Sequence, residues 1–187
     1  VGVARELSAR EPAFRDALAA CETAMAPFVD WSLHEQLHAD AGSPSFRMDD
    51  IAVIQPALLS VEIALAALWR AWGIEPAAVV GHSLGEVGAA YVAGALGLRD
   101  AMRVICRRSA LMRRTSGHGA MAVVELSTDE TETRLGPWDG RLTVAVSNAP
   151  RSTVVSGEPA ALLELLATLE AEGVFCQIGR ASCRERV

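Results

Sequence analysis

The stretch AAVVGHSLGEVGAAYVA, residues 77–93, decides the fold. Ala77–Val80 is a short apolar run, which predicts a buried strand of a parallel sheet. Val87–Ala93 is rich in small residues and predicts a helix. The GHSLG segment between them matches G-x-S-x-G, a tight strand-to-helix turn that exposes a serine. The stretch therefore predicts an α/β lobe with Ser83 as a nucleophile.

The turn has a physical requirement at each of its positions. Gly81 and Gly85 remove side chains that would clash where strand and helix approach each other. Ser83 Oγ would then lie at a helix N-terminus, where free backbone N–H groups favour developing negative charge. The N–H of Leu84 is the expected first oxyanion donor.

Helical spacing of apolar residues dominates the chain on both sides of this turn. The segments predicted to be helical are residues 2–25 with a break near Pro12, 31–37, 49–72 and 98–114. The third of these is apolar nearly all round, which places it in the interior of its domain, and Gly73 is expected to end it.

From Met121 onward the period changes to that of strands. The expected elements are a strand at 121–126, a helix at 127–135 opened by a Ser/Thr-Asp cap, strands at 142–147 and 152–156, a helix at 159–173 and a strand from Val174. This strand–helix–strand–strand–helix–strand order is the split βαβ, ferredoxin-like pattern. We therefore expect a partial α/β lobe followed by a small inserted lobe.

Composition excludes several function classes. Half of the residues (51%) are apolar and the net charge is −6, with no basic stripe for nucleic acid. No apolar stretch is uninterrupted over the length of a bilayer span, and no signal peptide begins the chain, so a soluble cytoplasmic protein is expected. The four cysteines have no metal-ligand spacing, which predicts free thiols and no metal site.

Several further motifs occur in a fixed order along the chain. They are IQPALL at 54–59, GHSLGE at 81–86 followed by AAYVAGAL, the pair Arg108–Ser109, GHGAMAVVEL at 117–126 and SNAPRSTVVSGEP at 147–159. Together they resemble malonyl-CoA:acyl-carrier-protein transacylases and the acyltransferase domains of modular polyketide synthases, most closely the latter. The resemblance covers about Gly2 to Cys176. It implies a partial α/β-hydrolase-like large lobe at 1–118 and a ferredoxin-like small lobe at 119–177.

The resemblance also implies a role for individual residues. Ser83 would attack an acyl-CoA thioester and hold the acyl group as an ester. Arg108 would form a bidentate pair with the free carboxylate of a malonyl-type unit, which a planar guanidinium does better than lysine. Gln55 would lie near the acyl group, His82 beside the nucleophile, and Asn148 in the small lobe close to the pocket.

The partners follow from the same resemblance. The acyl group would pass from coenzyme A to the phosphopantetheine thiol of an acyl-carrier protein, by a ping-pong route in polyketide biosynthesis. No bound metal or redox cofactor is implied, and neighbouring polyketide-synthase domains are expected partners. The run Asp50–Gln55 is slightly more similar to methylmalonyl-using than to malonyl-using domains.

Two parts of the family pattern are missing from the chain. The family has a GQGxQ segment before the point that matches Val1, and a general-base histidine in an A-x-H-S segment after the small lobe. Residues 177–187 (QIGRASCRERV) contain no histidine, and His34, His38 and His118 are not expected to replace it. We therefore expect 178–187 to be a non-native tail, from a frameshift or read-through, and the isolated chain to be a poor enzyme.

Two other function classes remain open at this point. A serine α/β-hydrolase or thioesterase would use the same elbow, although it has no need of a carboxylate-binding arginine at Arg108. A non-catalytic docking or scaffold fragment would have no need of Ser83, Arg108 and Gln55 together.

Overall fold

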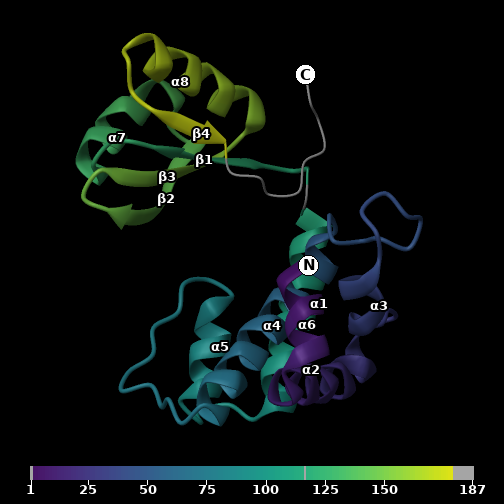
Figure 1. Cartoon of the computed structure of the whole chain (residues 1–187). Helices are drawn as coiled ribbons and strands as arrows, with labels where there is room; N and C mark the ends of the chain where they lie inside the picture. Colours follow the sequence, from purple (N-terminus) through teal and green to yellow (C-terminus); the bar gives the residue numbers. More distant parts are fainter. Residues whose placement is uncertain (1, 116, 179–187) are drawn as a thin grey trace. The chain divides into compact units, whose positions relative to one another are not determined.

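The computed structural model describes residues 2–115 and 117–178, and the chain forms two compact units, Val1–Arg114 and Thr115–Val187. In its described part, the first unit contains helices joined by loops and no strand (Figure 1). Its elements are α1 (Gly2–Arg10), α2 (Pro12–Met25), the 3-10 turn η1 (Ala26–Phe28), α3 (Leu33–His38), α4 (Ile51–Ala71), α5 (Gly85–Val92) and α6 (Leu98–Thr115).

Local sequence explains where these helices begin and end. Glu11 is extended (φ −114°), as the residue before a proline must be, and Pro12 then opens α2, so the predicted break is confirmed. Gly73, at φ +79°, ends α4 with the hydrogen bond from Ile74 N–H to Trp69 O (3.0 Å). The glycine stop expected from the sequence is therefore present.

Helix α4 is the central element of the first unit. Its buried positions include Val53, Leu59, Ile63 and Leu68, and it packs against α2 and α5. By length and composition this helix could span a bilayer, but 44% of its most apolar window is buried within the unit. It serves here as a core helix, as its all-round apolar pattern predicts.

The segment Ala77–Val80 is not the buried strand that its composition predicts. It is irregular, and Val80 is 96% exposed. A strand needs a neighbour for its N–H and C=O groups, and the described part of the first unit contains no strand to pair with. Its apolar side chains consequently face solvent, together with those of Ile74 and Trp72.

The second unit is the predicted ferredoxin-like lobe. Its elements are β1 (Ala120–Val124), α7 (Thr128–Leu135), the 3-10 turn η2 (Gly136–Trp138), β2 (Leu142–Ala149), β3 (Ser152–Gly157), α8 (Pro159–Ala171) and β4 (Cys176–Ile178). The strands form one antiparallel sheet in the order β2-β3-β1-β4. Helices α7 and α8 pack on this sheet, so the split βαβ prediction is confirmed.

The start of α7 shows how a local signal defines an element in this unit. Ser127 Oγ accepts from the Glu130 N–H, and Glu130 Oε2 accepts from the Ser127 N–H at 2.9 Å. This capping box is the cap predicted at Ser127. At the other end of the lobe, Ile178, the first residue of the predicted tail, belongs to β4, while the rest of that tail lies outside the described residues.

The buried cysteines are packing residues. Cys21 and Cys106 are free and lie in the core of the first unit. Burial raises the pKa of Cys21 to about 12, against a smaller lowering by the hydrogen bond with Ser60, and burial raises the pKa of Cys106 to about 11. Both thiols therefore stay protonated and unreactive at neutral pH.

Candidate functional site

The turn at Ser83 has the geometry of a nucleophile elbow. Ser83 is the single non-glycine residue with positive φ (+57°) in the described part of the chain. The turn is closed by hydrogen bonds from Gly85 N–H to His82 O (3.0 Å) and from Glu86 N–H to Ser83 O (3.2 Å). A left-handed serine costs on the order of 1–3 kcal/mol, and such strain is concentrated at functional sites.

The two glycines of the motif are not equivalent. A Cβ on Gly81 would lie 2.2 Å from Gly85 O and 2.3 Å from Glu86 N, both backbone atoms. A Cβ on Gly85 would meet nothing within 4 Å. The expectation that both glycines prevent a clash is therefore right for Gly81 and wrong for Gly85, whose Cβ would point into open space.

Helix α5 is held close to α4 behind the elbow. A Cβ on Gly88 would lie 3.2 Å from both Glu62 Oε2 and Leu59 Cδ1, so a small residue is favoured there. Burial against α5 raises the pKa of Glu62. At the other end of α5, Arg70 Nη2 donates to Val92 O at 2.8 Å. These contacts fix the direction of the helix that carries Ser83 at its start.

Three predicted site residues meet at the elbow. Arg108 Nη2 donates to Ser83 Oγ at 3.0 Å, and Arg108 Nη1 donates to Gln55 Oε1 at 2.8 Å. The three side chains come from α6, the elbow and α4, and their mutual hydrogen bonds could not be deduced from sequence spacing. The guanidinium is half-buried, while Ser83 remains exposed.

The other predicted residues take different positions. His82 precedes Ser83 and is exposed, and Leu84 directly precedes the first residue of α5. Asn148 lies on β2 of the second unit and is exposed. The roles expected for these three residues stay predictions.

The surroundings of Ser83 are open. One cavity, of about 250 Å³, is lined by residues of α1, α2 and α3. Another, of about 380 Å³, is lined by residues around Trp69 and Val92. Ser83 lines neither of these two cavities. Within the described ranges, no group of three or more His, Cys, Asp or Glu side chains could hold a metal ion. At the elbow itself, the described side chains place a hydroxyl beside a guanidinium.

One interaction near the site was not anticipated. Asp50 accepts from the Ala52 N–H at 2.9 Å as the N-cap of α4, and also from Arg113 Nη1 of α6 at 3.1 Å. An aspartate before a long apolar helix is a recognisable cap signal, but nothing in the sequence indicates its second partner.

Comparison with known proteins identifies the family. The sequence profile described as "Acyl transferase domain" matches residues 1–183, and the chain belongs to this family. The match extends into the segment that we expected to be a non-native tail.

The relatives narrow the class to polyketide synthases. The chain is 48% identical over 173 residues to erythronolide synthase EryA2 of Saccharopolyspora erythraea, and 49% identical over 177 residues to polyketide synthase GfsE of Streptomyces halstedii. These matches cover 92% and 95% of the chain but only 5% and 4% of those proteins, so the chain spans a small fraction of its curated relatives.

Solved acyltransferase domains have the same fold. The domain from module 8 of the salinomycin polyketide synthase matches with a TM-score of 0.82 at 46% identity, over 90% of this chain and 40% of that one. A loading acyltransferase from the avermectin synthase matches with a TM-score of 0.85 at 45% identity, over 93% of this chain and 55% of that one. The resemblance inferred from the motifs is thereby confirmed at the level of family and fold.

Proposed function

We propose that this chain is the part of a polyketide-synthase acyltransferase that carries the nucleophile and selects the acyl group. Ser83 Oγ attacks the carbonyl carbon of an acyl-CoA thioester, the C–O bond forms and the C–S bond breaks. The serine proton ends on the thiol of coenzyme A. The phosphopantetheine thiol of an acyl-carrier protein then attacks the ester, and its proton returns to Ser83.

The observation that carries this proposal is the guanidinium 3.0 Å from the nucleophile. In a malonyl ester the free carboxylate carbon is three bonds from the serine oxygen. Arg108 is therefore within reach of that carboxylate once the ester has formed. A hydrolase acting on uncharged acyl groups has no use for a permanent positive charge at this point.

Gln55 and Leu84 have supporting roles in the proposal. Gln55 accepts one N–H of Arg108 and Ser83 accepts another, which leaves the other N–H groups of the guanidinium for the carboxylate. The Leu84 N–H would stabilise the negative charge that develops on the thioester oxygen. His82 would border the nucleophile, and Asn148 would contact the substrate from the small lobe. The general base and the second oxyanion donor would come from segments other than residues 1–176, as the family resemblance implies.

The wider assignments belong to the same proposal. Coenzyme A serves as the substrate carrier, the prosthetic phosphopantetheine belongs to the carrier protein, and neighbouring synthase domains are partners in the cytoplasm. The acyl group is of the malonyl class. Between malonyl and methylmalonyl, the run Asp50–Gln55 slightly favours methylmalonyl, because it is more similar to that of methylmalonyl-using domains.

The test measures acylation of the full-length protein that contains this sequence, by intact mass after mixing with malonyl-, methylmalonyl- or acetyl-CoA. We expect a malonyl-type adduct that Ser83→Ala abolishes. Arg108→Gln should slow malonyl acylation about 10- to 100-fold, the loss of a charge-assisted pair, and should leave acetyl acylation nearly unchanged. An adduct that persists in Ser83→Ala would refute the proposal, and an ester that water removes within seconds would favour the thioesterase alternative.

A further inference from the structure

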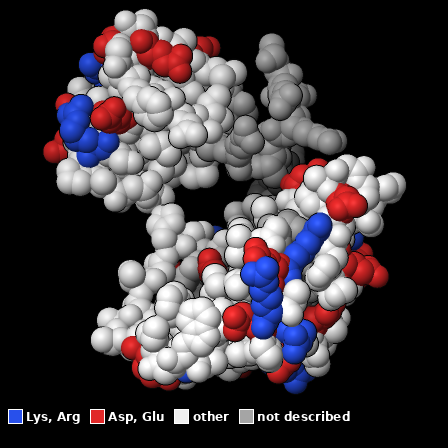
Figure 2. All heavy atoms as spheres, viewed as in Figure 1, with Lys and Arg blue, Asp and Glu red and all other residues white. Residues whose placement is uncertain are grey.

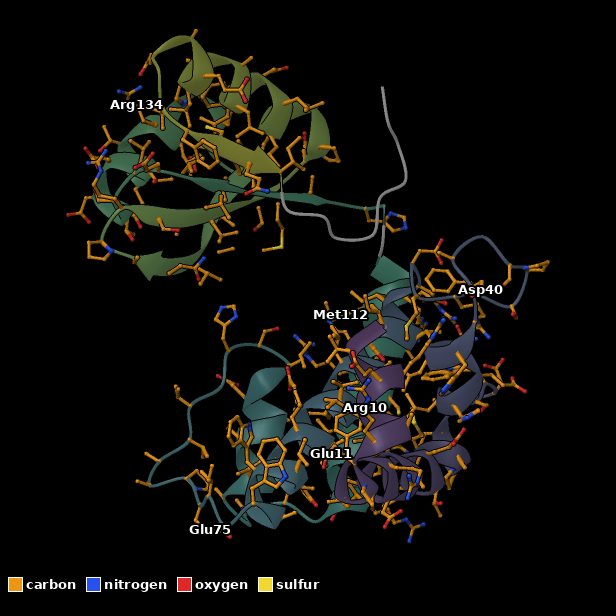
Figure 3. All side chains as sticks on the ribbon, in the orientation of Figure 1. Arg10, Glu11, Asp40, Glu75, Met112 and Arg134 are labelled. Carbon is orange, nitrogen blue, oxygen red and sulfur yellow. The ribbon has the colours of Figure 1, made fainter. Side chains whose placement is uncertain are left out.

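Helices α4 and α6 are joined by two side-chain links near the elbow. One is the hydrogen bond between Arg108 and Gln55, and the other is the ion pair between Asp50 and Arg113, which we call the Asp50–Arg113 clamp. Figure 3 labels Met112, the residue before Arg113, near the end of α6 where the clamp lies. The proposed function uses the first link and leaves the second without a role.

The spacing of the two links is matched on both helices. Gln55 follows Asp50 by five positions, and Arg108 precedes Arg113 by five positions. Five helical residues rise about 7.5 Å, so the links lie about one and a half turns apart. A single link would leave α6 free to turn about that point, whereas two links at separate heights oppose both sliding and rotation.

The clamp residue Asp50 is constrained on both of its oxygens. Asp50 Oδ1 caps α4 by accepting from the Ala52 N–H. Asp50 Oδ2 accepts from Arg113 Nη1 at 3.1 Å, and Arg47 Nη2 lies 3.7 Å from the same oxygen. Only 21% of the Asp50 side chain is exposed, against 53% for Arg113. Because the carboxylate is hydrogen-bonded to the first turn of α4, it is a fixed anchor for the more exposed arginine.

We propose that the Asp50–Arg113 clamp is a positioning element that holds the Arg108 guanidinium in register with Ser83 and thereby sets the preference for carboxylated acyl groups. This inference rests on the proposed function. Both clamp residues act through Arg108 and do not touch the acyl group. Without the clamp, the hydrogen bonds to Gln55 and Ser83 would be left to hold the guanidinium, which could then swing away from the carboxylate position.

The test compares acylation rates with malonyl-CoA and acetyl-CoA in the full-length protein. Asp50→Asn keeps the N-cap but removes the charge, and Arg113→Gln leaves the cap untouched. We expect each variant to lower the malonyl-to-acetyl rate ratio about two- to fivefold, the range for a partly exposed ion pair. Arg113→Lys should restore most of the ratio, and Arg114→Gln, with the same charge change on the next residue, should not alter it.

The outcomes separate this inference from the proposed function. Equal slowing with both thioesters would show that the clamp only stabilises the fold, and an unchanged ratio in Arg113→Gln would show that it has no role in selection. Either result overturns the inference while the function stands. A wild-type protein that is acylated by neither thioester overturns both.

Discussion

Replacement of Gly81 by alanine tests the geometry of the elbow directly. The new Cβ would lie 2.2 Å from Gly85 O and 2.3 Å from Glu86 N, and ordinary contact begins at 3.4 Å. The backbone must therefore separate by about 1 Å, because neither atom belongs to a flexible side chain. Overpacking of this kind costs about 1–3 kcal/mol, and a 1 Å displacement of a catalytic group reduces rates about 100-fold.

The assay for Gly81→Ala has two readouts, the denaturant midpoint and the rate of Ser83 acylation in the full-length protein. Gly85→Ala is the matched control in the same motif, since its Cβ would meet nothing within 4 Å and alanine favours the first turn of α5. We expect Gly81→Ala to lose both stability and acylation, and Gly85→Ala to retain both. If the two variants behave alike, the argument from close backbone approach is refuted.

Two further predictions concern electrostatics and capping. Burial raises the pKa of Asp50, but hydrogen bonds from the Ala52 N–H and Arg113 and the charges of Arg113 and Arg47 outweigh it, so the pKa lies below its ordinary value of 3.8. The stability that this lowered pKa contributes is present above about pH 4 and is lost as the pH falls through the pKa of the folded state. The denaturant midpoints of wild type and Asp50→Asn should therefore converge at that low pH. A difference between the two midpoints that stays constant with pH would contradict this reasoning. Ser127→Ala should destabilise the second unit by about 1 kcal/mol and speed amide exchange in α7, whereas Ser127→Asn, which can still cap, should do neither.

Local signals in the sequence predicted most of the elements. Pro12, Gly73 and the cap at Ser127 act on their own neighbours, so the helix boundaries that depend on them were predictable. The order of strands and helices after Met121 likewise defined the ferredoxin-like lobe, because hairpin and crossover connections leave few ways to arrange four strands.

The segment Ala77–Val80 shows where local reasoning ends. Its composition is that of a buried strand, but burial and pairing are properties of its neighbours and not of the segment. The described part of the first unit supplies no strand beside it, and Val80 is left 96% exposed. Composition predicted a buried strand, and the structure shows an irregular, exposed segment in its place.

The candidate site divides in the same way. Ser83 could be found from its motif, because the elbow is a local structure with its own sequence requirement. Arg108 and Gln55 were identified through the family resemblance, and their contacts with Ser83 depend on how α4 and α6 pack. The Asp50–Arg113 contact joins residues 63 positions apart and had no signal beyond the cap at Asp50.

The helical unit carries charged side chains of both signs, many of them paired. Figure 2 shows blue and red residues interspersed over the helical unit in this view, without an extended surface of one sign. The first unit contains Ser83, Arg108, Gln55 and the clamp. Side-chain hydrogen bonds link the first three of these residues, and the described part of the unit has no strand. If Ser83 and Arg108 act as proposed, recognition of the acyl group is separable from turnover, which also needs a base and a second oxyanion donor.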